Sequence, residues 1–476
     1  MSFSMVATPF SYYESDDCGY CLLKKIPKPL ASKEVPQNAA CPSKPVHISI
    51  GAQIITMTVE TYEKCMNLGF RRSGVFLYKT DMLRNCCRMY TIRTNMLQMK
   101  ISKEHRQVVN RFKRAIADTP QDETLAKTFD LRSLIDAEQK SSRFTTTYDS
   151  PHFTVEKYEL YKKYQTIVHK DPPEEVSENG FRLFLIQTPF TRDAILGDEE
   201  EWALLDTWVK DWRPDSPLAK CTRKGPVHEC YYLDGKLIAL SILDFLPGSL
   251  SSVYFIYDPD YAHLSLGTLL SLREILMCNE LGIPYYYLGY YIDDCKKMRY
   301  KAKFGGEILD VCNNVFVPFE KVDSLLKGDQ LWTLGNIGSE TNASDKLASL
   351  LSSEPQLDLD VDPKVYQGQV SNSAESIYGN EATYSDAKEE LMTIYNNYDV
   401  SDMEVPLVLP GAITIRQIKE KLLDPETNLL GWFFDGDNQE VNTEFAKMDS
   451  MKRQFLLDCI RLLGYDICQS LLILSF

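Results

Sequence analysis

The chain has 476 residues, of which 44% are hydrophobic and 25% are charged, so it is globular by composition and long enough for two or three domains. No stretch approaches the roughly 20 apolar residues that span a membrane, and no N-terminal segment joins a basic start to an apolar run. The odd number of cysteines, 13, indicates a reducing compartment. We therefore expect a cytoplasmic protein, with the nucleus as a further location and no membrane partner.

The formal net charge of −15 speaks against a nucleic-acid partner, but the charge is distributed unevenly. Between Phe70 and Arg114, twelve Lys and Arg residues stand against Asp81 and Glu104. Residues 340–404 hold 14 acidic residues and three lysines. The basic stretch can bind phosphates even in an acidic protein, whereas the acidic segment is expected to be an insertion or a mobile linker.

Two cysteine pairs mark the N-terminal part of the chain. Cys18 and Cys21 form a CxxC pair, and the adjacent Cys86 and Cys87 lie inside the basic stretch, where neighbouring arginines favour the thiolate form. Four thiolates suit either a tetrahedral zinc ion or an iron–sulfur cluster, and the spacing does not separate the two. The sequence therefore predicts a metal centre within an anion-binding surface.

Short β-rich runs around one helical segment predict a small α+β domain over residues 47–117. In its last part, the spacing of Val108, Phe112 and Ile116 predicts an amphipathic helix. Between Arg71 and Arg93, aromatic residues alternate with cations, which suits base stacking combined with phosphate contact.

Further along, helical patterns cover residues 155–169 and 200–210. An Asp-Gly turn predicts a hairpin from HECYYL and KLIALSILDFLP. It is followed by a strand SSVYFIYDP, a helix from Ser265 to Gly282 and a strand PYYYLGYYI. This order is typical of a GNAT-type acyltransferase core with an anion site at the helix N-terminus. The predicted fold class is α+β, with an N-terminal cysteine and metal-cluster lobe beside a GNAT-like acyltransferase core.

Five segments are predicted along the chain. They are an N-terminal Cys-rich basic domain (1–120), a linker with a helical segment (121–220), a GNAT-like catalytic domain (221–330), an acidic low-complexity insertion (331–410) and a C-terminal helical segment packing on the core (411–476). The last segment has a core pattern with Phe455, Leu456, Ile460 and Leu463 on one helix face.

Several long and uncommon strings carry a resemblance to one family. They are CGYC, MNLGFRRSGVFLYK, LRNCCRMYTIR, GPVHECYY, LSSVYFIYDPDY, SLGTLLSLREI and YYYLGYYIDDCKKMRYKAKF. Together they resemble the eukaryotic arginyl-tRNA protein transferases, and most closely the fungal form. The resemblance runs from about Cys18 to Pro318 and does not extend to the tail beyond Leu326.

The resemblance implies transfer of arginine from arginyl-tRNA to the free N-terminal amine of proteins that begin with Asp, Glu or oxidised Cys, which marks them for N-degron ubiquitin-dependent degradation. It also implies that Cys18, Cys21, Cys86 and Cys87 hold an iron–sulfur cluster, with [4Fe–4S] favoured and zinc as the alternative occupant. The GNAT-like half is implied to use aminoacyl-tRNA in place of acyl-CoA. We expect a monomer that works upstream of ubiquitin-ligase machinery.

Aminolysis of an aminoacyl ester needs positioning and oxyanion stabilisation more than acid–base power, because a free α-amine has a pKa of about 7.7 to 8.0. Backbone N–H groups along Ser251–Phe255 are candidate oxyanion donors. His228 and Glu229 are the candidate acceptors of the amine proton, although a His at a strand start is more often structural. No serine nucleophile set or Walker loop is present, so we expect no covalent enzyme intermediate.

The remaining candidates bind substrates. Asp258, Asp293 and Asp294 follow predicted strand ends and suit the guanidinium of the donated arginine. Cations suit either the acidic first residue of the acceptor or tRNA phosphate. The predicted substrate- and tRNA-binding set is Arg71, Arg72, Lys79, Arg88, Arg93, Tyr254, Asp258, Tyr287, Asp293, Asp294, Arg299 and Lys301.

Two other classes of function stay open on the residues alone. A CoA-dependent acetyltransferase would share the core, but the SLGT turn lacks the fuller glycine-rich loop of CoA enzymes and the basic lobe has no use there. A non-catalytic RNA-binding metalloprotein would explain the cysteines and the basic stretch, but it leaves HECYY and YYYLGYYIDD unexplained.

Overall fold

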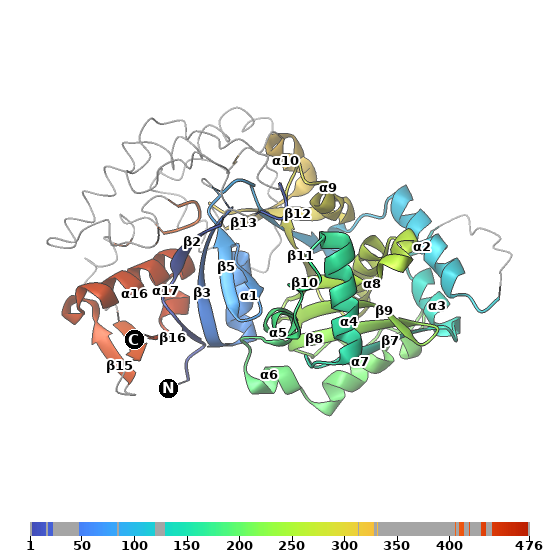
Figure 1. The fold of residues 1–476 in the computed structure, drawn as a ribbon, viewed down its shortest axis with the longest axis horizontal. Coiled ribbons are helices and arrows are strands. Elements are labelled where there is room, and N and C mark those ends of the chain that lie inside the picture. The colour runs from blue at the N-terminus through green and yellow to red at the C-terminus, as the bar shows by residue number, and fades with distance from the viewer. Residues whose placement is uncertain are drawn as a thin grey trace.

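The computed structural model describes residues 2–15, 18–21, 47–82, 85–119, 129–312, 314–327, 331, 405, 409–413, 418, 430–434 and 440–474. Within them the chain forms two mixed eight-stranded sheets with helices packed against both (Figure 1). The predicted α+β class is confirmed, while the GNAT type of the core stays a prediction. None of the described helices has the length and apolar character needed to cross a membrane.

The predicted helix between Ser265 and Gly282 and the two strands of the predicted hairpin are present, together with elements that were not predicted. The strands are β1 Met5–Ala7, β2 Ser11–Ser15, β3 His47–Met57, β4 Arg71–Ser73, β5 Phe76–Thr80, β6 Tyr90–Asn95, β7 Phe144–Asp149, β8 Gly225–Leu233, β9 Lys236–Phe245, β10 Ser249–Tyr257, β11 Tyr285–Tyr291, β12 Gly306–Asp310, β13 Val315–Pro318, β14 Leu430–Phe434, β15 Glu440–Glu444 and β16 Leu471–Leu474. The α-helices are α1 Val59–Asn67, α2 Lys103–Ile116, α3 Ser133–Lys140, α4 Val155–Tyr164, α5 Glu178–Phe181, α6 Arg192–Leu196, α7 Glu199–Asp211, α8 Leu266–Glu280, α9 Lys296–Arg299, α10 Phe319–Leu326, α16 Ser450–Leu463 and α17 Tyr465–Cys468. Short 3-10 or π turns include η2 Gln165–His169, η3 Arg182–Ile186 and η5 Tyr300–Phe304.

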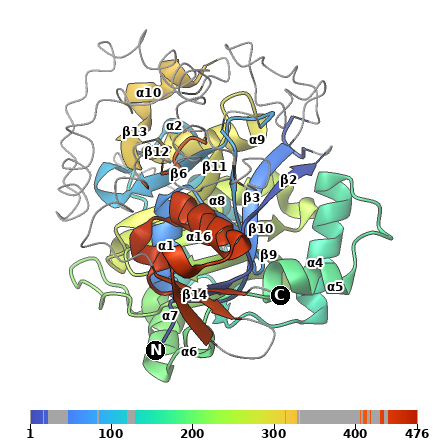
Figure 2. The same cartoon turned by 90° about the vertical axis from the view of Figure 1, so that its left-hand side faces the viewer.

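The first sheet has the strand order β15-β14-β16-β1-β3-β5-β4, with β2 paired to β3. Near its middle β1 runs parallel to β16, so that Met5 lies opposite Leu471. Helix α16 packs its buried face, which includes Leu456, Ile460 and Leu463, into the core that this sheet shares with α1. Figure 2 shows α16 in front of the strands on this side of the molecule. The predicted apolar helix face near the end of the chain is confirmed.

The second sheet has the order β13-β12-β6-β11-β10-β9-β8-β7. Its β8–β9 hairpin turns at Asp234 and Gly235, whose φ angles are +52° and +77°, as the favoured two-residue hairpin turn requires. One face packs on α8, α2 and α3, and the other on α4 and η3. Because both faces are covered, polar side chains on the central strands become buried.

Both sheets take strands from more than one of the predicted segments. β6, from the N-terminal segment, lies between β11 and β12 of the second sheet, and β14 and β16, from the last segment, extend the first sheet. The predicted boundaries themselves stay predictions. Almost all of the predicted acidic insertion, residues 331–410, lies outside the described residues.

The neighbouring strands β10 and β11 are paired over only part of their length. They run parallel with Ser249–Ser251 opposite Tyr285–Tyr287. Beyond these residues β10 pairs with β9 alone, and β11 pairs with β6 alone. Each strand has a register shift near this point, and such irregularities bend a strand away from its neighbour. We call the unpaired stretch, bordered by residues 252–257 and 288–291, the strand split.

Candidate active site and metal centre

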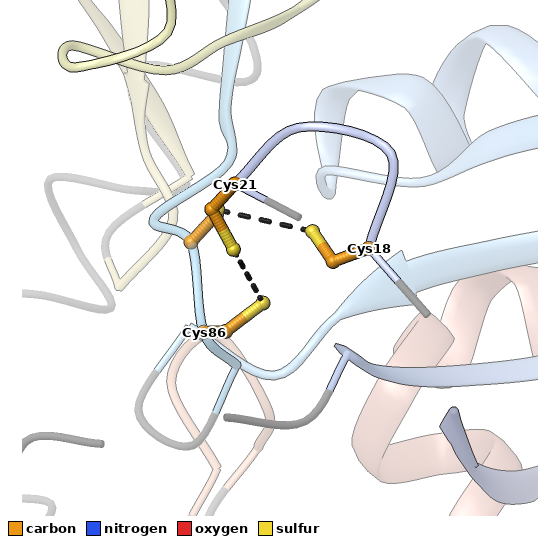
Figure 3. A group of neighbouring side chains, drawn as sticks. Cys18, Cys21 and Cys86 are labelled. Atoms are coloured by element: carbon orange, nitrogen blue, oxygen red, sulfur yellow. Dashed lines mark hydrogen bonds between the residues drawn. The ribbon is translucent and has the colours of Figure 1, made fainter. Parts of the chain in front are cut away.

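The four predicted metal ligands lie together, with one pair after β2 and the other before β6. Their Sγ atoms all lie within 4.8 Å of one another, with 3.6 Å between those of Cys21 and Cys86 and 4.0 Å between those of Cys18 and Cys87. Figure 3 shows the labelled cysteines pointing toward one centre. Asn85 holds the second pair in place, because its side chain accepts a hydrogen bond from the Ile48 N–H and donates one to the Cys87 carbonyl.

The sulfur spacing fits a single tetrahedral ion. A zinc–sulfur distance of about 2.3 Å sets the four sulfurs roughly 3.8 Å apart. Hydrogen bonds from Cys86 and Cys87 hold the pKa of the Cys18 thiol far below its usual value, and the contact with Cys18 raises the pKa of Cys86. The thiols thus already stabilise a thiolate among themselves, which is the form that binds a cation. The predicted four cysteines can hold a metal, and the geometry leaves its identity open.

Aromatic side chains surround the strand split on the β10 side. The Tyr254 ring packs edge-on against Phe184 of η3 and Tyr164 of α4, with centroids 4.7 and 6.5 Å apart. Its hydroxyl donates a hydrogen bond to Gln165 at 3.1 Å. Burial raises the pKa of the Tyr254 phenol well above its usual value, so this hydroxyl stays protonated. The predicted substrate residue Tyr254 is therefore a neutral phenol at the split, with its proton donated to Gln165.

Two cations, the buried Arg71 and the half-buried Lys301, border the strand split on the β11 side. The Arg71 guanidinium donates to the Gly289 carbonyl at 3.5 Å and lies 5.5 Å from the Tyr290 ring centre. The Lys301 ammonium donates to the Tyr290 carbonyl at 3.0 Å, and burial, followed by the charge of Arg71, lowers the pKa of Lys301 to about 7. Within the described residues neither cation has a carboxylate partner, and Nε of Arg71 has no hydrogen-bond partner at all. Buried charges need compensation, so this pair is suited to an anion.

The predicted proton acceptors, His228 and Glu229, are both fully buried on β8. Nε2 of His228 lies 3.0 Å from the Leu185 carbonyl and Nδ1 lies 3.4 Å from Nζ of Lys157. Burial, followed by the charge of Lys157, lowers the pKa of His228 to about 3. Glu229 forms an ion pair with the buried Arg273. Because both faces of β8 are covered, these groups have no path to a substrate, and the structure gives the predicted catalytic role no support.

Two of the cations predicted to meet tRNA or the acceptor form buried ion pairs instead. Arg72 donates two hydrogen bonds of 2.7 Å to Asp244. Arg93 pairs with Glu307 at 2.7 Å and lies 3.7 Å from the ring centre of Phe316. The alternation of aromatics and cations therefore reflects packing between the two sheets, where rings and carboxylates surround each guanidinium. The prediction of a surface that stacks bases over β4–β6 is corrected accordingly.

Two further predicted cations are also buried. Arg88 donates to the Met82 carbonyl. Lys79 is 2% exposed, and its Nζ has no hydrogen-bond partner, although it lies 5.1 Å from the Phe70 ring centre. It lines a small pocket, part of which is open to solvent, together with the equally unpartnered Oγ1 of Thr91. Neither cation faces a surface that tRNA can reach.

The predicted acidic and tyrosine residues divide into two groups. Asp258 is buried between Lys163 at 2.5 Å and Lys236 at 2.7 Å, so its carboxylate is already neutralised. Tyr287 is buried under Arg71 and Arg93 and serves as a wall. The others follow β11 at the strand split and are accessible: Asp293, Asp294 and Arg299. Their predicted contact with substrates stays a prediction that the fold permits.

One polar group beside Tyr254 had no counterpart among the predicted residues. Residues Gln165–His169 form a π turn after α4, and Nε2 of His169 lies 3.3 Å from the Tyr254 hydroxyl. The only sequence feature that pointed to His169 was the predicted helix over residues 155–169, which ends at this residue. Nothing local indicates its partner, because the contact joins residues 85 positions apart.

Comparison with known proteins identifies the family that this chain resembles. Family models for the N terminus and the C terminus of arginine-tRNA-protein transferase match residues 16–107 and 156–310. The chain is 35% identical over 452 residues to arginyl-tRNA–protein transferase 1 of Saccharomyces cerevisiae, covering 90% of this chain and 88% of that protein.

More distant relatives match shorter parts. An aspartate/glutamate leucyltransferase of Pseudomonas fluorescens is 28% identical over 253 residues, which cover 52% of this chain and 79% of that protein. The solved structure of L-PGS from Bacillus licheniformis aligns with a TM-score of 0.22 at 10% identity, over 43% of this chain and 45% of that one, a likeness too low to assign the fold. The two family models and the extended match to the yeast protein agree, and the chain belongs to the arginyl-tRNA–protein transferase family.

Proposed function

We propose that this chain transfers arginine from arginyl-tRNA to the free N-terminal α-amine of proteins that begin with Asp, Glu or oxidised Cys. The observation that carries the acceptor preference is the pair of cations Arg71 and Lys301 at the strand split, which donate to backbone carbonyls and have no carboxylate partner among the described residues. A carboxylate or sulfinate on the first residue would supply the charge that they lack. In this family the arginylated product is marked for ubiquitin-dependent degradation through an N-degron.

The strand split suits the chemistry of aminolysis. Beyond Ser252 the backbone N–H groups on the β11-facing edge of β10 have no partner strand among the described residues, so they can stabilise the oxyanion that forms on the ester carbonyl. The α-amine nitrogen bonds to the carbonyl carbon, and the C–O bond to the tRNA ribose breaks. The enzyme positions both substrates and forms no covalent intermediate. The separation of the parallel strands β10 and β11 is the observation that supports our proposal of a GNAT-type core.

Phosphate contacts of the tRNA require cations on the surface. Helix α2 offers them, since Lys103, Arg106 and Arg114 are exposed while Val108 and Phe112 face the core. We therefore move the proposed tRNA contact from the buried β4–β6 cations to this helix face and to the exposed Arg299 beyond β11.

For the metal centre we propose one four-coordinate ion such as zinc in preference to the [4Fe–4S] cluster. A four-iron cluster binds each thiolate to a different iron and needs sulfurs more widely spaced than the 3.6 and 4.0 Å contacts between these pairs. A metal bound by all four thiolates supplies a structural link between the CxxC loop and the turn before β6. One zinc per chain without visible absorbance would support this assignment, whereas stoichiometric iron and sulfide with a visible band would favour the cluster.

The decisive test uses two peptides that differ only in a free or acetylated N-terminal Asp, with radiolabelled arginyl-tRNA as donor and acetyl-CoA as the control donor. Label on the free-amine peptide alone supports the arginyltransferase. Acetylation without arginylation would move the chain to the CoA enzymes, and neither product would leave an RNA-binding metalloprotein. The monomeric state and the cytoplasmic or nuclear location are part of the same proposal.

A further inference from the structure

We propose that His169 is the catalytic residue that accepts the proton of the attacking α-amine. This inference rests on the proposed function and names a group for it that the sequence did not indicate. It replaces the buried pair on β8 with an imidazole that reaches the strand split.

The local backbone explains why this imidazole turns toward the sheet. Helix α4 ends at Tyr164 and continues as the π turn Gln165–His169, which is closed by Lys170 with a left-handed φ of +71°. A π turn adds a residue to the helical turn and redirects the side chains that follow, and such turns recur at functional sites. The His169 ring packs edge-on against the Tyr164 ring, with centroids 5.3 Å apart.

The contacts with Tyr254 and with the Tyr164 ring define the position of the His169 ring. On the β10 side, Nε2 of His169 lies 3.3 Å from the Tyr254 hydroxyl, which also bonds to Gln165. The Tyr254 proton is donated to Gln165, whose Nε2 donates to Asp171. The Tyr254 oxygen therefore accepts from Nε2–H of His169, which leaves Nδ1 as the basic nitrogen. Across the strand split, the charge of Lys297 on α9, which follows β11, also acts on His169. The imidazole therefore lies beside Tyr254 at the β10 border of the strand split.

The ring is also in the required protonation state. Burial, followed by the charge of Lys297, lowers the pKa of His169 below its usual value, while Asp171 opposes the shift. Tyr164 and Tyr254 are the other titratable groups that face it, and burial raises the pKa of both phenols, so they stay neutral. A neutral imidazole at pH 7 can take a proton, and unlike His228 this side chain is solvent-accessible.

The proton balance of the step is simple. As the amine nitrogen bonds to the ester carbonyl carbon, its proton passes to Nδ1 of His169. The proton then moves to the ribose oxygen as the ester C–O bond breaks. His169 ends neutral, and the tRNA leaves with a free hydroxyl.

The experiment compares His169→Ala and His169→Gln with His152→Gln in single-turnover arginyl transfer under saturating Asp-peptide. His152 is an exposed matched control that contacts the Ser150 carbonyl and does not contact Tyr254. We expect both His169 variants to lose at least about 100-fold in the transfer rate, with unchanged binding of peptide and arginyl-tRNA, while His152→Gln stays near wild type. Thermal unfolding of each variant verifies that it is folded.

A second readout separates proton transfer from mere packing. Added imidazole should restore transfer by His169→Ala in a saturable manner that grows as the imidazole becomes neutral with rising pH. Wild-type rates in the His169 variants would overturn the inference, and so would a loss that imidazole does not restore in a folded variant. Wild-type enzyme that fails to transfer arginine at all would instead overturn the proposed function.

Discussion

At the scale of single residues, the half-buried Lys301 and the buried Lys79 have different surroundings. Lys301 has one carbonyl partner and a neighbouring guanidinium at the strand split, whereas Nζ of Lys79 has no hydrogen-bond partner in the pocket that it lines. Both carry lowered pKa values because burial penalises the charged form. The surroundings of Lys301 suit the binding of a substrate carboxylate, whereas the unpartnered ammonium of Lys79 lowers the free energy of unfolding.

Lys301→Met should weaken the binding of an Asp-peptide about tenfold or more, because a buried hydrogen bond to a charged group is lost. Lys301 in the free enzyme has a pKa of about 7, so wild-type affinity for the peptide should also fall as pH rises through 7 and the ammonium loses its charge. Fluorescence anisotropy of a labelled Asp-peptide between pH 6 and 8.5 measures both effects.

Lys303→Met is the matched control, since Lys303 is exposed and pairs with Glu104 on the surface. Equal weakening by both variants, or an affinity that does not change with pH, would contradict the role given to Lys301.

Lys79→Met should stabilise the protein by about 1–3 kcal/mol, because Met fills a similar volume without a buried, unpartnered ammonium. The pKa of Lys79 falls from 10.5 in the unfolded chain to about 8. Between these values the unfolded state binds more protons, so wild-type stability should rise with pH across this window and that of the variant should not. Urea unfolding at pH 7.5 and 9.5 checks both points; a destabilised variant, or one that has lost arginyl transfer, would contradict them.

At the scale of elements, hydrophobic periodicity was sufficient to predict single helices and strands. Their pairing partners depend on contacts between residues that are distant in the sequence. The β8–β9 hairpin and helix α8 follow from an Asp-Gly turn and from apolar runs that are local in sequence. The pairing of β6 with β11 joins residues nearly 200 apart, and it is this pairing that buries Arg93. Local patterns therefore predicted which residues are cationic and could not predict that they face another sheet.

The same reasoning applies to the candidate site. The four cysteines were predictable because thiolate pairs have few other uses at this spacing. His228 was chosen for its place at a strand start, and only the cover of α4 and η3 over β8 reveals that it is enclosed. Solvent access depends on the tertiary packing of distant segments, so it could not be predicted from the local sequence around His228.

Metal removal should act first on the elements that the cysteines join. Because Cys18 and Cys21 follow β2 while Cys86 and Cys87 precede β6, a chelator should lower the melting temperature and make the CxxC loop the first site of proteolysis. Differential scanning fluorimetry and limited proteolysis with mass spectrometry test this, and restored protection after adding zinc is the control. Unchanged melting and cleavage in metal-free protein would contradict a structural metal.

At the scale of the whole molecule, buried charges within the second sheet link several elements. Arg273 of α8 pairs with Glu138 of α3 at 2.7 Å and with Glu229 of β8. Glu274 lies beside them and accepts hydrogen bonds from Ser241 at 2.6 Å and from Tyr286. Three carboxyl groups surround one guanidinium, so full ionisation would leave an excess of negative charge. Burial, followed by the charge of Glu229, raises the pKa of Glu274 to about 8, and protonation of Glu274 removes the excess.

This network makes stability depend on pH. The folded pKa of Glu274 lies above its unfolded value of 4.5, so its contribution is fully present below pH 4.5 and is lost as pH rises toward 8. Glu274→Gln, which mimics the protonated carboxyl, should lose about 3 kcal/mol less than wild type between pH 5.5 and 8.5. Urea unfolding at the two pH values measures the difference, with the exposed Glu104→Gln as control; parallel losses in all three proteins would contradict the assignment.

The parallel contact of β1 with β16 has a consequence for how the protein is made. Met5 finds its partner Leu471 only after nearly the whole sequence has been synthesised, and until then one edge of β1 exposes unpaired N–H and C=O groups. Pairing across such a separation is slow to form, and an open edge invites association with other chains. A truncation that removes β16 would therefore leave an unpaired strand edge on β1. We expect such a chain to aggregate or to depend on chaperones, although no catalytic group has been removed.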